Sequence, residues 1–383
     1  MSDSFQLVSS NAQGAAAADD DDVCAITTQN LSAETPVLSI PSDLILTGSK
    51  ARQELGSETY GAEQSLALSD HQAFYLFLKV LKEYELGDQS PWYYWLNSLP
   101  RYYSNGASMT DFCFGCLPPY AAGLALKEKK LLTQFVEALD NVSFLSMESK
   151  SNDDLTKWAY NVVFTRYTEN SGGDYCIAPM ADYLNHGAAE TQANACIMYD
   201  EGTGDGYVFT TRDIAAGEPL LFSYADSTNP SNIMAKYGFL DESSSATFCK
   251  YVIENSSLEI AKLGYPSSML FYNDGGISNE VWDVLLYELL MVSPDEQQNF
   301  YQAHMNGDEG TKQYYHEQYY SQTFNAIRSH VNYILNELGE LRIALETQID
   351  VQRHPRLPLL IRHNEFVEGT FDNVRKNLNN MNS

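Results

Sequence analysis

Three short strings between residues 158 and 239 hold the side chains whose types and spacing could do chemistry. They are WAYNVVFTRY (158–167), PMADYLNHG (179–187) and TTRDIAAGEPLLFSYADSTNPSNIMAKYGF (210–239). Asn185 and His186 end an apolar segment, where a side-chain amide, an imidazole and the backbone can bind a ligand together. Alone, this pair is better explained as a helix-capping asparagine and a packed histidine, so the order and spacing of the three strings carry the prediction of a binding site.

This order of strings resembles the SET domain, a family of protein methyltransferases. In that family a P-x-x-D-x-x-N-H pattern is followed by R-D-I-x-x-G-E, by a strand that ends in tyrosine and by Y-G-F, and all of these stand here in that order. The string HPRLPLLIRHNEFVEGTFDNVRKNL (354–378) and the helical stretch 64–148 are similar to the Rubisco large-subunit methyltransferase group of the family. The resemblance therefore covers most of the chain.

The resemblance implies an enzyme that transfers a methyl group from S-adenosyl-L-methionine to a lysine of a protein substrate. The transfer needs no metal, because the sulfonium carbon is already electrophilic and the nucleophile is a neutral amine. A dry, apolar channel lowers the pKa of the lysine from its reference value of about 10.4 and so favours that amine. Two alternatives stay open, namely a SET-like protein that binds without catalysis and a protein-histidine methyltransferase.

Tyr224 is the catalytic residue that the resemblance implies. The family places a tyrosine at the end of this strand, beside the transferred methyl group, where weak C–H···O contacts align the methyl donor with the amine. The resemblance also implies cofactor binding by Arg166, Asp182, Asn185, His186, Tyr224 and Phe239, and substrate binding by Tyr237 and Phe239. Without it, Arg166 would be a surface salt-bridge residue, and Tyr237 and Phe239 would be core aromatic residues.

One feature of the family is altered ahead of the string AITTQNL. Members of the group have a G-x-G loop there, because glycine lets the backbone approach a cofactor closely. Asp22, Val23 and Cys24 stand at the aligned positions here, and Ala225 replaces the glycine that is common after the tyrosine. We expect this change to weaken cofactor binding, unless residues 11–14 form the loop instead.

Positioning these residues requires an α+β fold, which we expect to be a β-rich SET fold with a helical insertion, followed by an all-helical C-terminal domain. The predicted SET domain spans 1–255 with its insertion at 62–150, and a helical substrate-binding domain spans 256–383. Alternating and β-branched residues predict strands at 5–9, 23–31, 35–41, 42–46 and 219–224, and a hairpin at 197–211.

Apolar residues three and four positions apart predict the helices. Asp70 can cap a helix whose apolar face is formed by Phe74, Phe77, Leu78 and Leu81. Further helices are predicted at 92–99, 119–137, 154–164 and 229–238, and the chain is predicted to be helical from Ser256 to its end. The last stretch carries an apolar stripe of Ile327, Val331, Ile334, Leu338, Leu341 and Leu345.

Composition narrows the class of protein. With 23 Lys and Arg against 51 Asp and Glu, the net charge is −28, which argues against direct binding of nucleic acid. No apolar run reaches the roughly 18 residues of a membrane span, and the N-terminus lacks the basic and apolar parts of a secretory signal. We therefore expect a cytosolic or nuclear monomer with six reduced cysteines, whose partner is a protein with an exposed lysine.

Overall fold

The computed structural model describes residues 4–9, 23–188, 192–243, 246–248, 263–265, 269–346 and 350–381. The chain forms two compact units. The first comprises Met1–Met109, Ala125–Asp226 and Met234–Phe239, and the second comprises Thr110–Leu124, Ser227–Ile233 and Leu240–Ser383. Short strands and helices share the first unit, and helices dominate the second, which confirms the predicted α+β class. The predicted domain boundaries stay predictions.

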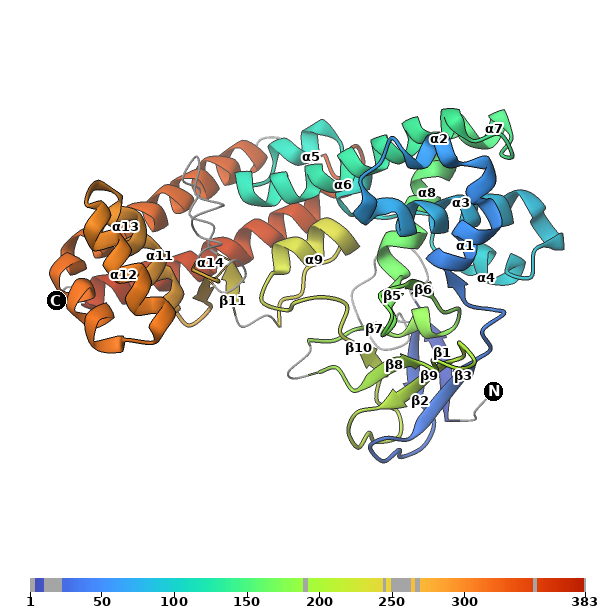
Figure 1. Cartoon of the computed structure of the whole chain (residues 1–383), viewed down its shortest axis with the longest axis horizontal. Coiled ribbons are helices and arrows are strands. Elements are labelled where there is room, and N and C mark those ends of the chain that lie inside the picture. The colour runs from blue at the N-terminus through green and yellow to red at the C-terminus, as the bar shows by residue number, and fades with distance from the viewer. Residues whose placement is uncertain are drawn as a thin grey trace. The chain divides into compact units, whose positions relative to one another are not determined.

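Short strands in the first unit join distant parts of the sequence (Figure 1). They are β1 (Phe5–Ser9), β2 (Val23–Thr27), β3 (Pro36–Ile40), β4 (Leu46–Thr47), β5 (Thr168–Glu169), β6 (Tyr175–Ile177), β7 (Asn185–His186), β8 (Ala195–Tyr199), β9 (Gly206–Thr210) and β10 (Leu221–Phe222). The sheets have the strand orders β3-β9-β8, β4-β6-β5, β1-β2 and β7-β10. Because β3 pairs antiparallel with β9, Leu38 lies opposite Val208, and strands on both sides of the helical insertion form one sheet.

Alternation along these strands builds a small core. In β9, Val208 is fully buried, whereas its neighbours Tyr207 and Phe209 are half-buried, as the period of two in a strand requires. Val208 shares this core with Leu184 and Phe222, and the half-buried Tyr224 packs against it. The segments that carry the candidate site residues therefore rest on a packed support.

Helices form the remainder of the first unit. They are α1 (Gly48–Leu55), α2 (Tyr60–Glu63), α3 (His71–Leu86), α4 (Tyr93–Ser98), α7 (Met147–Lys150) and α8 (Asp153–Arg166), together with α6 (Pro119–Ala138), whose first residues belong to the second unit. The helices predicted at 92–99, 119–137 and 154–164 are confirmed as α4, α6 and α8. Asn152 caps α8, because its side-chain oxygen accepts a hydrogen bond from the backbone N–H of Leu155.

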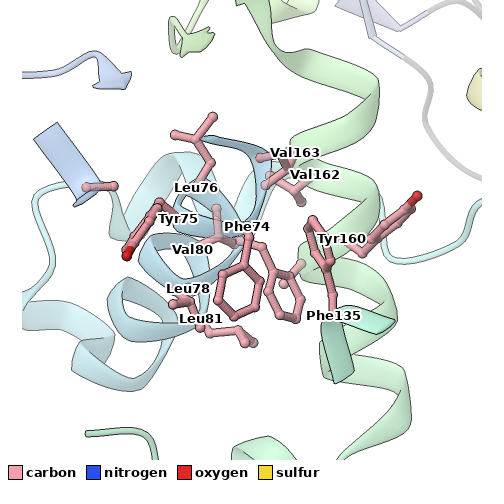
Figure 2. Close-up of a cluster of buried hydrophobic side chains, with 14 of the residues drawn as sticks. Phe74, Tyr75, Leu76, Leu78, Val80, Leu81, Phe135, Tyr160, Val162 and Val163 are labelled. Carbon is pink, nitrogen blue, oxygen red and sulfur yellow. The ribbon is translucent and has the colours of Figure 1, made fainter. Parts of the chain in front are cut away.

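Figure 2 shows the aromatic and aliphatic core between α3, α6 and α8. The predicted apolar face of α3 is confirmed, since Phe74, Phe77, Leu78 and Leu81 are completely buried. Phe74 meets Phe135 edge to face, with ring centroids 5.2 Å apart. Each such side chain stabilises the fold by roughly 1.5–3 kcal/mol, so α8 has a firm support along its length.

Asp70 occupies the position before α3, but its side chain does not cap the helix. A 3-10 turn, Leu68–Asp70, leads directly into α3, so the backbone of Asp70 is already close to helical, with φ −98° and ψ −8°. An N-cap residue needs extended backbone to aim its side chain at the first free N–H groups. The Asp70 carboxylate instead accepts a hydrogen bond from the Ser69 hydroxyl at 3.2 Å.

The second unit is mainly helical. Its elements are α5 (Asp111–Gly115), β11 (Ala246–Phe248), β12 (Leu270–Tyr272), α11 (Asn279–Leu289), α12 (Pro294–Asn306), α13 (Glu309–Glu346) and α14 (Leu357–Met381), and α9 (Pro230–Tyr237) begins in it. The predicted stripe on α13 is confirmed, with Ile327, Val331 and Leu338 almost wholly buried. No helix among the described residues is long and apolar enough to span a membrane.

The prediction of continuous helix from Ser256 onward is wrong at β12. Leu270–Tyr272 pairs antiparallel with Ala246–Phe248, and the central Phe271 is completely buried. A three-residue strand is too short to show a period of its own in the sequence, and its pairing with a distant strand decides its conformation. Ser256 itself lies outside the described residues.

Candidate active site

The strand pair β7–β10 brings the N-H pair and the tyrosine together. The two strands run parallel, with Asn185 opposite Leu221 and His186 opposite Phe222. Asn194, which is almost completely buried, secures β10, because its side chain accepts from the backbone N–H of Leu221 and donates to Pro219 O, each at 2.8 Å. Tyr224 follows β10 by two residues and so lies beside His186.

Three hydrogen bonds fix Tyr224. Its hydroxyl donates to Leu184 O at 2.7 Å, and its backbone N–H donates to His186 Nδ1 at 3.1 Å. The hydroxyl of Tyr237 donates to the carbonyl of Tyr224 at 3.0 Å. Since the Tyr224 hydrogen is given to Leu184, the phenolic oxygen acts as an acceptor toward any further group. Since Nδ1 of His186 accepts, the ring hydrogen of a neutral His186 is on Nε2.

Three rings gather around this tyrosine. Tyr224 lies 5.1 Å from Tyr237, 5.4 Å from His186 and 6.4 Å from Phe239 by ring centroids. The His186 and Phe239 centroids are 5.5 Å apart. All four side chains are half-buried. The sequence thus placed a catalytic candidate and its aromatic neighbours correctly as one cluster, although their individual roles remain predictions.

Gly238 allows Tyr237 and Phe239 to face the same cluster. Its φ is +84°, a region that only glycine adopts at little cost. A Cβ added there would stand 2.8 Å from the backbone nitrogen of Asn105, closer than real contacts allow. The glycine of the Y-G-F tripeptide therefore serves both backbone geometry and close packing.

Arg166 and Asp182 form a buried ion pair in the same unit. Nη1 of Arg166 donates to both the backbone carbonyl and Oδ2 of Asp182, each at 2.9 Å, and the side chains are 12% and 1% exposed. Burial raises the pKa of Asp182, and the Arg166 guanidinium opposes that rise. Arg166 therefore lies away from the surface, and it already has a charged partner within the protein.

Two polar atoms of this pair have no hydrogen-bond partner among the described residues. They are Oδ1 of Asp182, an acceptor, and Nε of Arg166, a donor, and both are buried. A buried polar atom left unpaired costs roughly 1–3 kcal/mol, so such atoms mark sites where a ligand or water completes the hydrogen bonding. One buried donor and one buried acceptor of the same ion pair suit a ligand that carries both a carboxylate and an ammonium group.

Asn185 connects β7 to the first strands. Its side-chain amide donates to Val23 O at 3.4 Å. The prediction that Val23 and Cys24 form a loop is wrong, because both belong to β2, where Cys24 lies opposite Val8 and is 8% exposed. The β-branched and apolar side chains of this stretch favour the strand over a loop. Asp22 and residues 11–14 lie outside the described residues.

Two contributors to the site escaped the sequence reasoning. Trp95 on α4 donates its indole N–H to Asp182 Oδ2 at 2.9 Å. The Lys236 ammonium lies 4.6 Å from the ring centroid of Tyr167 and 5.3 Å from that of Tyr237. The string around Trp95 predicted only a short helix, and nothing in the sequence indicated a contact with a residue 87 positions away.

Comparison with known proteins decides the family. The sequence model of the SET domain family matches residues 22–225, more than half of the chain. The chain belongs to the SET domain family. No curated protein matches this SET chain closely in sequence.

Solved structures of similar fold agree with this membership. The SET domain of LSMT bound to lysine and AdoHcy is 13% identical, with a TM-score of 0.64 over 97% of this chain and 89% of that one. Rubisco LSMT bound to AdoMet is 14% identical, with a TM-score of 0.62 over 94% and 85%. Rubisco LSMT bound to sinefungin and monomethyllysine is 15% identical, with a TM-score of 0.61 over 96% and 87%. The resemblance drawn from the sequence is therefore confirmed at the level of family and fold.

Proposed function

We propose that this SET protein is an S-adenosyl-L-methionine-dependent methyltransferase that acts on a lysine amine of a protein substrate. The observation that carries the proposal is the setting of Tyr224, whose N–H and carbonyl are hydrogen-bonded to His186 and Tyr237 and whose hydroxyl donates to Leu184 O. Such a group is held in one orientation before any ligand binds, which is the condition for efficient alignment of reacting atoms.

The buried pair beside this cluster fits the proposed cofactor. The methionine part of S-adenosyl-L-methionine carries an ammonium group, which can donate to Oδ1 of Asp182, and a carboxylate, which can accept from Nε of Arg166. Both protein atoms are buried and lack partners among the described residues. The bound cofactor would supply an electrophilic methyl group. Asn185 and His186 are the further residues that we expect to hold it, and Phe239 would cover it.

The rings around Tyr224 suit a lysine side chain. The rings of Tyr224, Tyr237 and Phe239 can pack against the aliphatic stem and shield the amine from water. Water exclusion disfavours the ammonium form and so favours the neutral nucleophile. The acceptor oxygen of Tyr224 can then orient groups at the point of transfer, while the leaving proton passes to solvent.

Titration calorimetry with S-adenosyl-L-methionine, followed by mass spectrometry of protein extracts incubated with the enzyme and labelled cofactor, tests the proposal. We expect saturable binding and label on lysine. Label on histidine would replace the lysine assignment with the histidine one. Absence of cofactor binding by the folded protein would leave only a protein-binding role for this SET fold.

A further inference from the structure

Trp95 connects the helical insertion to the buried pair of the candidate site. Its indole is 9% exposed and lies on α4, and its single donor is directed at Oδ2 of Asp182 at 2.9 Å. The same Oδ2 accepts from Nη1 of Arg166 at 2.9 Å. Both donors therefore use one oxygen of the carboxylate, and Oδ1, the other oxygen, has no partner among the described residues.

We infer that Trp95 is a positioning residue, which holds Oδ2 of Asp182 toward α4 and thereby keeps Oδ1 available to the ammonium group of the cofactor. This inference rests on the proposed function. Without Trp95, Arg166 would be the remaining side-chain donor to Oδ2, and the carboxylate would be held less firmly against rotation about its Cβ–Cγ bond. The second donor, on a helix packed into the core, fixes the rotation.

The segment after Asp182 transmits the same constraint to Tyr224. Asp182 lies in a 3-10 turn, Ala181–Tyr183, and the next residue is Leu184, whose carbonyl accepts the Tyr224 hydroxyl at 2.7 Å. A carboxylate held at the centre of this turn therefore also steadies the acceptor that orients the tyrosine. The Asp182 carboxylate thus connects Trp95 of the helical insertion with the segment that leads into β7.

Electrostatics supports this role and supplies a readout. Burial raises the pKa of Asp182, and the Arg166 guanidinium, the Trp95 N–H and the backbone N–H of Met180 oppose the rise. Tyr103 and Tyr183 are the other titratable groups that interact with it. Removing the indole N–H raises the pKa of Asp182 further, so protonation begins at a higher pH. A protonated Asp182 no longer attracts an ammonium group. On acidification, the affinity for the cofactor should therefore begin to fall at a higher pH than in the parental protein.

Trp95→Phe removes the donor and keeps an aromatic ring. The matched control is Trp158→Phe, because Trp158 is another buried indole of the same unit, 3% exposed, and donates to a backbone carbonyl, Pro100 O, at 3.1 Å. Both variants lose the same atoms, and only one of them acts on Asp182. Calorimetry with S-adenosyl-L-methionine across the pH range, with thermal unfolding beside it, compares them with the parental protein.

We expect Trp95→Phe to bind the cofactor about tenfold more weakly near neutral pH, the size typical of a lost hydrogen bond to a charged group, and to lose affinity at a higher pH on acidification. Trp158→Phe should keep the parental affinity and pH profile. Equal affinity and an unchanged profile in Trp95→Phe would overturn the inference while the proposed function stands. A parental protein that binds no cofactor would overturn both.

An NMR measurement on the parental protein covers the case in which Trp95→Phe does not fold. The four tryptophans give separate indole ¹⁵N–¹H resonances, and Trp158→Phe identifies one of them. We expect one of the other three to titrate with Asp182 and to shift on addition of S-adenosyl-L-methionine. If none of the four responds to both pH and cofactor, Trp95 has no role in positioning the site.

Discussion

Replacing Tyr224 with phenylalanine removes one oxygen and separates catalysis from binding. The hydroxyl donates to Leu184 O at 2.7 Å, and Leu184 is 1% exposed. Loss of this bond leaves a buried carbonyl without that donor, which costs roughly 1–3 kcal/mol of folding stability. The ring contacts with Tyr237 and His186 stay, so the variant should fold.

The catalytic loss should be larger than the loss in stability. A hydroxyl that orients the reacting groups acts most strongly in the transition state, and deleting one such preorganised group lowers turnover by about 10²–10³-fold, or roughly 3–4 kcal/mol. Cofactor affinity should change by less than about threefold, since the proposed contacts of the cofactor with Arg166 and Asp182 remain. Single-turnover rates at saturating cofactor, paired with calorimetry, give both quantities.

Tyr199→Phe is the matched control. Its hydroxyl shares a 2.6 Å hydrogen bond with Thr168 Oγ1, in the same unit but outside the cluster around Tyr224. It should therefore show a similar loss of stability with parental turnover. A folded Tyr224→Phe protein, saturated with cofactor, that methylates its substrate at the parental rate would refute the catalytic assignment.

Three further changes test other parts of the molecule. Asn185→Ala should weaken S-adenosyl-L-methionine binding by about five- to hundredfold before it affects turnover, measured by calorimetry. Asp283→Asn should lower the free energy of unfolding at pH 7 by about 3–5 kcal/mol in urea titrations, because the 5%-exposed carboxylate pairs with Lys312 at 2.8 Å and His316 at 2.7 Å. Burial lowers the pKa of His363 from 6.5 to about 4, so the unfolded chain takes up a proton between these values and stability falls as pH drops through this window. His330, whose pKa burial also lowers to about 4, contributes a fall of its own in this window, so His363→Gln should reduce the loss of stability between pH 7 and pH 5 without abolishing it, as thermal unfolding at the two pH values would show.

Local patterns predicted the parts of the fold that local physics decides. The spacing of Phe74, Phe77, Leu78 and Leu81 gives α3 its buried face whatever else surrounds it. The same holds for the hairpin of β8 and β9, whose strands follow each other directly. By contrast, β12 depends on a partner outside its own neighbourhood, and the sequence around Phe271 was misassigned to a helix.

The candidate site shows the same division. The order of motifs was enough to group Asn185, His186 and Tyr224, and the pairing of β7 with β10 brings them together. The order of motifs did not reveal the partner of Arg166. The sequence predicted that Arg166 lies against the cofactor or in a surface salt bridge. That partner is set by packing between α8 and the turn at Asp182, and Trp95 enters only through the helical insertion.

Val23 and Cys24 show which kind of inference deserves more weight when two disagree. Alignment with the family motif placed them in a glycine loop, whereas their own side chains favoured a strand that starts at Val23. The strand is correct, because five consecutive residues of β2 pair with β1, from Val23 opposite Ser9 to Thr27 opposite Phe5. Glycine at Cys24 would remove a side chain that is 8% exposed from a paired strand and so weaken β2. Since Val23 O also accepts from Asn185, β2 itself contacts a predicted cofactor residue, and the hypothesis that a missing glycine at Cys24 weakens cofactor binding stays a prediction.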